Sequence, residues 1–325
     1  MSDINSEDLA NGIKRGDRVA LSKAITLIES TLPVHTAQAQ SLLKIVMSDT
    51  GQAIRLGISG VPGVGKSTLI ETLGMQLIEQ GHRVAVLAID PSSQRTGGSI
   101  LGDKTRMSQL SKHPQAFVRP SPSSGHLGGV TRMTRESLLL CEAAGFDVVL
   151  VETVGVGQSE TAVADMVDCY CLLMLPGAGD DLQGIKKGAL ELADIIAVNK
   201  ADGDRQIAAG HAKTAYSRAL SILQPTSSWQ PVALTCSAET GNGVQELWQC
   251  VLEHRSALEK TGELQSLRQE QRLRWLWSMI ENKLMAQLHS KDDLRSLITE
   301  VENDIKSGRL TVPVGCDKIL AAMGQ

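Results

Sequence analysis

The sequence predicts an α/β protein with a mostly parallel, doubly wound sheet and a helical extension at each end. Two observations predict this fold class. Short apolar runs alternate with helical patterns through the middle of the chain, as in βαβ units. Several of the runs are continuously apolar, which is typical of strands covered on both faces of a parallel sheet. The expected strands are residues 54–59, 83–89, 116–119, 147–151, 169–175, 195–198 and 232–235.

The first fifty residues predict an N-terminal helical extension, 1–50. Asp17 is a suitable N-cap for a helix with apolar residues three and four positions apart, and Pro33 is expected to end that helix. A second helix is expected over 38–47. The side chains expected to point inward are Leu21, Ala24, Ile25, Ile28, Leu32, Leu42, Leu43 and Val46.

The central domain is expected at 51–255, and residues 256–325 are expected to form a C-terminal helical arm. A leucine-rich stripe runs through 271–289, and a further helix is expected over 293–306. Such a stripe outside the main sheet either packs on its own domain or pairs with a second subunit, and we expect dimerisation. The stripe contains Leu273, Leu276, Ile280, Leu284 and Leu288, flanked by Trp275 and Trp277.

Composition narrows the range of functions. The chain of 325 residues has a formal net charge of −4, no tail of Lys and Arg, and 2% aromatic residues, so nucleic-acid binding is not expected. It has no signal pattern and no apolar run long enough to cross a bilayer, which predicts a cytoplasmic protein without a membrane span. Of the six scattered cysteines, Cys169 and Cys171 are expected as small core residues, with a metal-binding pair as the alternative.

Residues 60–67 read G-V-P-G-V-G-K-S between a predicted strand and a predicted helix. This is the G-x-x-x-x-G-K-[ST] phosphate loop in its strand–loop–helix context, and it predicts a P-loop NTPase fold. Backbone N–H groups of such a loop and the helix N-terminus bind phosphate oxygens. Lys66 is expected to reach the β- and γ-phosphates as a catalytic group, and Ser67 to ligate Mg²⁺. The expected phosphate-binding residues are Gly60, Pro62, Gly63, Val64, Gly65, Lys66, Ser67 and Thr68.

Asn199, Lys200 and Asp202 form an N-K-x-D sequence directly after a predicted strand. The Asp202 carboxylate can accept hydrogen bonds from the N1–H and the exocyclic amine of guanine, whereas adenine offers neither donor. Lys200 can lie against the base, and Asn199 can join this loop to the phosphate loop. A backbone N–H near Ser237 and Ala238 can meet the guanine O6. The predicted nucleotide is therefore GTP.

A GTPase also needs an acid that holds Mg²⁺ and a glycine N–H that senses the γ-phosphate. Glu152 and Gly155 follow a predicted strand and fit these roles, although most GTPases carry Asp at the first position. Asp90 ends another strand near the same pocket and is a second metal candidate, with a turn-forming Asp-Pro as the alternative. A glycine-rich loop containing Asp103 and Arg106 suits a segment ordered by nucleotide and Mg²⁺.

Five further stretches resemble the MeaB/ArgK family, the GTPases that accompany adenosylcobalamin-dependent methylmalonyl-CoA mutase. They read I-D-P-S-S at 89–93, G-G-S-I-L-G-D-K-T-R-M at 97–107, P-S-S-G-H-L-G-G at 122–129, V-E-T-V-G-V-G-Q-S-E at 151–160 and G-D-D-L-Q-G-I-K-K-G at 179–188. The resemblance covers nearly the whole chain and is looser in both helical ends.

The resemblance implies a homodimer joined through C-terminal helices that binds GTP or GDP with Mg²⁺. It also implies a chaperone whose nucleotide state gates loading of adenosylcobalamin onto the mutase and release of damaged cofactor, with the adenosyltransferase as a further partner. The implied catalytic positions are Lys66, Asp103 and Glu152, and the implied metal positions are Ser67, Asp90, Asp103 and Glu152. The implied switch positions are Arg106, Asp180, Gln183 and Lys186. Asp180, Gln183 and Lys186 lie in one loop. Without the resemblance, a plain connection between two elements is as good an interpretation of that loop as a switch.

Two other functions are compatible with a P-loop domain of this kind. A metallochaperone of the urease or hydrogenase accessory type would need a His-rich tract or a Cys-rich motif to carry its ion, and the sequence has neither. A small-molecule kinase linked to arginine transport would need a second substrate pocket and a base for the acceptor. The sequence shows no clear candidate for either.

Overall fold

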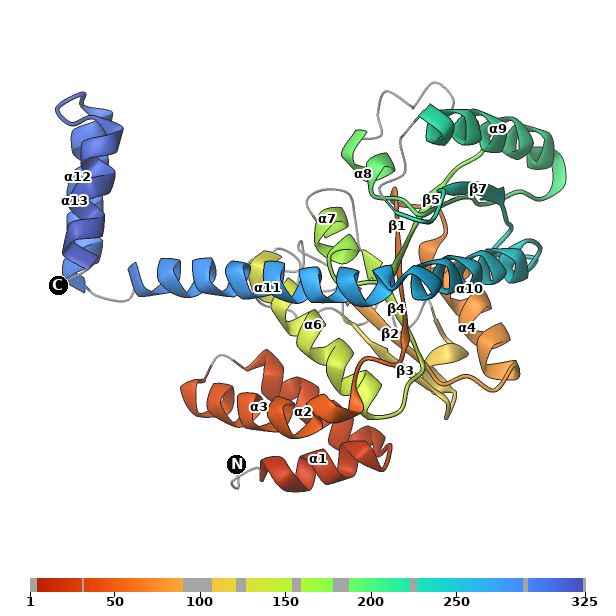
Figure 1. Cartoon of the computed structure of the whole chain (residues 1–325), viewed down its shortest axis with the longest axis horizontal. Coiled ribbons are helices and arrows are strands. Elements are labelled where there is room, and N and C mark those ends of the chain that lie inside the picture. The colour runs from red at the N-terminus through yellow and green to blue at the C-terminus, as the bar shows by residue number, and fades with distance from the viewer. Residues whose placement is uncertain are drawn as a thin grey trace. The chain divides into compact units, whose positions relative to one another are not determined.

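Seven parallel strands form one sheet in the order β3-β2-β4-β1-β5-β6-β7 (Figure 1). The structure is a computed structural model that describes residues 5–30, 32–89, 107–120, 127–153, 159–177, 187–222, 227–288 and 292–323. The strands are β1 (Ile54–Gly60), β2 (Val84–Ile89), β3 (Ala116–Arg119), β4 (Val148–Thr153), β5 (Cys169–Met174), β6 (Ile195–Val198) and β7 (Val232–Thr235). The predicted α/β fold with a parallel sheet is confirmed, and β1 lies at the centre of the sheet.

Both faces of the sheet are covered by helices, because successive strand residues point into opposite cores. In β4, Val149 and Val151 belong to one hydrophobic core, and Val148 and Leu150 belong to the other. Side chains of α6, α7, α8 and α9 complete the first core, and side chains of α4 and α10 complete the second. These helices are α4 (Lys66–Glu79), α6 (Leu127–Ala143), α7 (Ser159–Ala164), α8 (Lys187–Glu191), α9 (Gln206–Ile222) and α10 (Val244–Thr261).

Cys169 and Cys171 are both buried in the second core, as expected for small apolar residues of one strand face. Burial raises the pKa of both thiols well above the usual range. Among the described residues, no helix is long and apolar enough to cross a membrane.

The N-terminal helices pack on α6 and share the first core with the sheet. They are α1 (Ser6–Lys14), α2 (Arg18–Glu29) and α3 (Pro33–Val46). The Asp17 cap is confirmed, since its side chain accepts hydrogen bonds from the N–H groups of Val19 and Ala20. Two expectations are wrong. Pro33 opens α3, where its missing N–H is no loss, and Leu32 caps that helix at 54% exposure instead of pointing inward.

The chain divides into two compact units, Met1–Gln269 and Glu270–Gln325. The C-terminal helices are α11 (Glu263–Leu288), α12 (Asp292–Lys306) and α13 (Val312–Met323). The two helices expected here are present, and α13 is an addition that the sequence pattern did not indicate. Stripe residues exposed in the single chain are Leu273, Leu276 and Leu284. The division into three domains at 50 and 255 stays a prediction.

Candidate functional site

The phosphate loop connects the carboxyl end of β1 to the first residue of α4. Two of its glycines have backbone angles that other residues rarely adopt, with φ of +150° at Gly60 and +98° at Gly65. A Cβ on Gly65 would lie 2.6 Å from Nδ2 of Asn199, so this close approach requires glycine. Pro62 and Gly63 are exposed, which leaves the backbone at the tip of the loop accessible to a ligand.

Lys66 is only 8% exposed although it carries a charge. Its Nζ donates hydrogen bonds to the carbonyl oxygens of Gly60 and Val61, at 2.8 and 3.4 Å. The ammonium group is thereby held over the loop at the N-terminus of α4, where the helix dipole is also positive. A buried cation at the positive end of a helix strongly attracts a polyphosphate.

Ser67 and Glu152 meet between α4 and β4. The Ser67 hydroxyl donates to Oε1 of Glu152 at 3.0 Å, and Glu152 is 3% exposed. Pairing of Ile58 with Glu152 in the sheet fixes this acid beside the phosphate loop. The next residue, Thr153, donates from its hydroxyl to Ser59 at 2.9 Å and ties the same strands again. Hydroxyl and carboxylate oxygens are the hard donors that Mg²⁺ takes, so the pair fits this cation. β4 continues through Thr153, so Glu152 lies within the strand and not after it.

Asn199 joins two separate loops to each other. Its Nδ2 donates to the carbonyl of Val64 at 2.8 Å, and its Oδ1 accepts from the backbone N–H of Ala238 at 2.9 Å. Lys200 adds a second connection, because its Nζ donates to the carbonyl of Gly63 at 2.8 Å. The φ of Lys200 is +60°, and among the described non-glycine residues it alone has a positive value. The N-K-x-D loop is therefore attached to the phosphate loop by two side chains.

Both carboxylate oxygens of Asp202 accept hydrogen bonds. The Ser237 hydroxyl donates to Oδ2 at 2.6 Å, and Nη2 of Arg205 donates to Oδ1 at 2.5 Å. The hydrogen bond from Ser237, followed by that from Arg205, lowers the pKa of the Asp202 carboxyl below its ordinary value. Asp202 is therefore an anion at neutral pH, with lone pairs that can accept from a base.

Two contributors to this region were missed by the sequence analysis. Arg205 closes the short helix Gly203–Arg205, and its place three residues after Asp202 was a signal visible in the sequence. Thr72 donates from its hydroxyl to the carbonyl of Ala238 at 2.6 Å and links α4 to the loop after β7. Nothing in the sequence marks a helical threonine for such a contact.

The structure brings the described members of the predicted site together around the carboxyl ends of β1, β4, β6 and β7. The remaining predicted site residues lie outside the described part of the chain. They are Asp90, Asp103, Arg106, Gly155, Asp180, Gln183 and Lys186.

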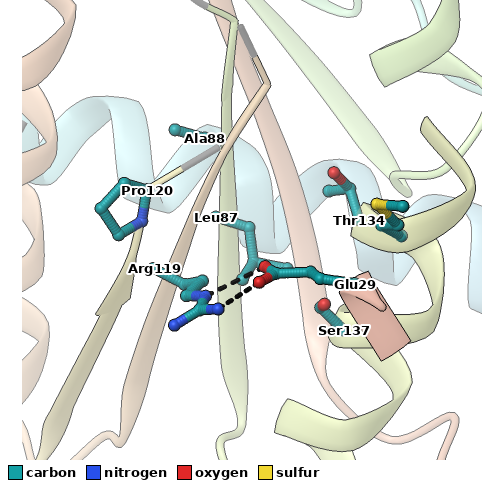
Figure 2. Close-up of a pocket in the computed structure, with 8 residues that line it drawn as sticks. Glu29, Leu87, Ala88, Arg119, Pro120, Thr134 and Ser137 are labelled. Carbon is teal, nitrogen blue, oxygen red and sulfur yellow. Dashed lines mark hydrogen bonds and ion pairs between the residues drawn. The ribbon is translucent and has the colours of Figure 1, made fainter. Parts of the chain in front are cut away.

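A small, open recess at the carboxyl ends of β2 and β3 shares no residue with the phosphate loop or the N-K-x-D loop (Figure 2). Its lining residues are Glu29, Leu87, Ala88, Arg119, Pro120, Met133, Thr134 and Ser137. In its wall, Arg119 donates from Nε to Glu29 Oε1 at 3.1 Å and from Nη2 to Oε2. This ion pair attaches α2, and with it the N-terminal helices, to β3.

Comparisons with known proteins identify the family. A sequence model of the family described as "Methylmalonyl Co-A mutase-associated GTPase MeaB" matches residues 21–293. A probable GTPase of Mycobacterium tuberculosis is 54% identical over 319 residues, which cover 98% of this chain and 95% of that protein. GTPase ArgK of Escherichia coli is 49% identical over 314 residues, which cover 94% and 95%.

A crystal structure described as "LAO/AO transport system kinase" superposes with a TM-score of 0.81 and 38% sequence identity, covering 100% of this chain and 99% of that one. The family match extends over both the phosphate loop and the N-K-x-D loop. Both relatives are named as GTPases, and the match covers 95% of each of them. This chain belongs to the MeaB family of GTPases.

Proposed function

We propose that the chain binds GTP and Mg²⁺ between the phosphate loop, β4 and the loops after β6 and β7, and works as a slow switch for an adenosylcobalamin-dependent acyl-CoA mutase. The main observation in support of a nucleotide site is that side-chain hydrogen bonds connect segments far apart in the sequence. Asn199 binds both Val64 and Ala238, while Ser67 binds Glu152. Family membership supports the choice of partner.

Asp202 is the residue that we propose recognises the guanine base. Its carboxylate, oriented by Ser237 and Arg205, would accept from the two N–H donors on the edge of guanine. Adenine would leave the carboxylate without these donors, and a site built to pair with a substrate N–H rejects an analogue that lacks it. Lys200 would lie along the base, and the N–H groups near Ala238 would face the O6.

Lys66 and the metal site are the proposed hydrolytic groups. The Lys66 ammonium would shift from the loop carbonyls to the β- and γ-phosphates, where it neutralises charge in the transition state. Ser67 would bind Mg²⁺ directly and Glu152 would bind it through water, and the ion would supply positive charge that stabilises the transition state. Asp90 and Asp103 remain proposed metal positions, Asp103 a proposed catalytic one, and Gly155 the proposed γ-phosphate sensor, all from the sequence.

The proposed role toward the mutase is to gate the loading of adenosylcobalamin and the release of damaged cofactor. The switch positions proposed for this are Arg106, Asp180, Gln183 and Lys186. A homodimer through α11 is supported by exposed apolar side chains on that helix, which are Leu273, Leu276, Trp277, Leu284 and Met285. The adenosyltransferase is a further proposed partner, and the cytoplasm is the proposed compartment.

The test is hydrolysis of GTP by the purified protein with and without methylmalonyl-CoA mutase, with ATP as the control substrate. We expect GTP to be hydrolysed in preference to ATP and the rate to rise when the mutase is added. Lys186→Ala should retain the basal rate and lose the stimulation. If the mutase neither binds nor changes the rate, the partner assignment fails while the GTP site stands.

One observation favours a second candidate. The solved structure with a TM-score of 0.81 is described as a kinase of a transport system, so transfer of the γ-phosphate to a small molecule is the alternative. Incubation with γ-labelled GTP or ATP and amino acids such as lysine, arginine and ornithine separates the two. Label found only in inorganic phosphate supports the GTPase switch, and label in an organic product supports the kinase.

A further inference from the structure

Three metal-ligating side chains converge at the amino-terminal edge of the sheet, opposite the nucleotide loops. Cys169 is the first residue of β5, Asp194 directly precedes β6, and His254 lies on α10. One sulfur, one carboxylate oxygen and one imidazole nitrogen from these residues all lie within 4.8 Å of one another. Cys169 and His254 are 1% and 2% exposed, whereas the Asp194 side chain is 29% exposed, so the cluster is mostly buried and opens to solvent on the Asp194 side.

The spacing of the cluster fits shared coordination better than hydrogen bonding. Nε2 of His254 lies 3.5 Å from Oδ1 of Asp194, whereas a charge-assisted N–H···O bond measures about 2.7–2.9 Å. Nitrogen and oxygen ligands that are each about 2.0–2.1 Å from one tetrahedral zinc ion lie about 3.3–3.4 Å apart. Nδ1 of His254 is buried and has no hydrogen-bond partner among the described residues.

The surrounding residues hold Asp194 and His254 in this arrangement. The second carboxylate oxygen of Asp194 accepts from the backbone N–H of Tyr170 at 2.7 Å, which aims the first oxygen at His254. The carbonyl of Asp194 accepts from Nε1 of Trp229 at 3.0 Å. The Trp229 ring also packs edge-on against His254, with centroids 5.3 Å apart. Outer contacts of this kind orient the ligands of protein metal sites.

We propose that Cys169, Asp194 and His254 bind one Zn²⁺ ion, which ties β5, β6 and α10 together. Thiolate, imidazole and carboxylate are the donors found in zinc sites, and the thiolate disfavours Mg²⁺ and Ca²⁺. Binding replaces the Cys169 thiol proton, which leaves to solvent. Solvent can supply the remaining ligand, because the Asp194 side chain is 29% exposed.

The test uses the full-length protein, stripped with a chelator under reducing conditions and titrated with Co²⁺ as the spectroscopic probe. We expect one Co²⁺ per chain, with a thiolate-to-cobalt charge-transfer band and the d–d bands of tetrahedral cobalt. Zn²⁺ should displace it and abolish both sets of bands. Because Trp229 contacts His254, Co²⁺ binding should also quench tryptophan fluorescence.

Matched variants assign the ligands. Cys169→Ala and His254→Gln should each weaken Co²⁺ binding at least tenfold, while Cys141→Ala should not. Cys141 is an equally buried cysteine in the other core, so it controls for the loss of a core thiol. At a Zn²⁺ concentration a hundred times Kd, Tm should rise by about 5 °C in the wild type and in Cys141→Ala only.

Nucleotide binding by each variant distinguishes misfolding from the loss of a metal ligand, because the cluster lies away from the GTP site. A variant that still binds nucleotide is folded. His254→Gln serves as the second variant where Cys169→Ala does not fold. Three results would overturn the proposal: less than half an equivalent of bound Co²⁺, a cobalt spectrum without the thiolate band, or an unchanged spectrum in folded Cys169→Ala.

Discussion

Replacing Asn199 with alanine tests how the nucleotide pocket is held together. Asn199 is 1% exposed, and it satisfies the carbonyl of Val64 and the N–H of Ala238 at 2.8 and 2.9 Å. Asn199→Ala leaves the Val64 carbonyl and the Ala238 N–H without the side chain that binds them, and the smaller alanine does not fill the space of the amide. A buried backbone group that loses its partner costs about 1–3 kcal/mol. Two such groups, partly rescued by water at the open loop, should lower the free energy of unfolding by about 2–4 kcal/mol.

The same substitution should weaken binding of both GTP and GDP at least tenfold. The reason is that the phosphate loop and the N-K-x-D loop would no longer be fixed at the spacing that one nucleotide spans. Urea unfolding measures the first effect and isothermal titration calorimetry the second. Asn11→Ala, at an exposed position of α1, is the control and should change stability by no more than about 0.5 kcal/mol. An Asn199→Ala protein as stable as that control, with unchanged nucleotide affinity, would refute the reasoning.

Three further predictions concern other parts of the chain. Glu152→Gln keeps an acceptor for Ser67 but loses the charge that we propose holds Mg²⁺. Steady-state hydrolysis should therefore fall at least tenfold, while GDP binding measured in chelator is retained. Burial raises the pKa of Glu136 from 4.5 to about 7. The folded state therefore binds the proton more tightly than the unfolded state does, and this stabilisation is complete below pH 4.5. As the pH rises to 7, the free energy of unfolding should fall by about 3 kcal/mol. Thermal unfolding at pH 5 and 8 should show that Glu136→Gln removes this decline, and an equal decline in the variant would contradict it. Arg268→Met leaves the buried Asp168 carboxylate without its bidentate partner and should cost about 3–5 kcal/mol in urea unfolding; a loss below 1 kcal/mol would count against a buried charge pair.

The parts of the site that the sequence predicted are those encoded in one continuous stretch. The phosphate loop is defined by the spacing of its glycines and Lys66, and the N-K-x-D loop by four consecutive residues. Their local geometry follows from local sequence, so the pattern is sufficient. The strands were predictable for a related reason, since a strand buried on both faces must be apolar throughout.

What escaped prediction depends on pairs of residues far apart in the chain. Thr72 reaches Ala238 only because α4 and α10 cover the same face of the sheet. Cys169 and His254 meet only because β5 and α10 are neighbours. Leu32 looked like the end of an apolar stripe, but α2 ends at Glu29, and Pro33 starts α3. For the Thr72 and Cys169 contacts, helical or strand periodicity carries no information about which elements become neighbours, whereas the Leu32 error is local, because proline is common at the first position of a helix.

The two edges of the sheet differ in how firmly β1 is held. At the amino-terminal edge, Arg268 donates to both oxygens of Asp168 at 2.7 Å and to the carbonyl of Ala53 at 2.8 Å. Asp168 in turn accepts from the N–H of Arg55 at 3.0 Å, and the Arg55 side chain forms a second buried pair with Glu142. Removing one partner of such a pair costs several kcal/mol, so this edge resists local displacement. A change that follows GTP hydrolysis is therefore expected at the carboxyl edge, where the phosphate loop ends in exposed backbone and the links to it are single hydrogen bonds.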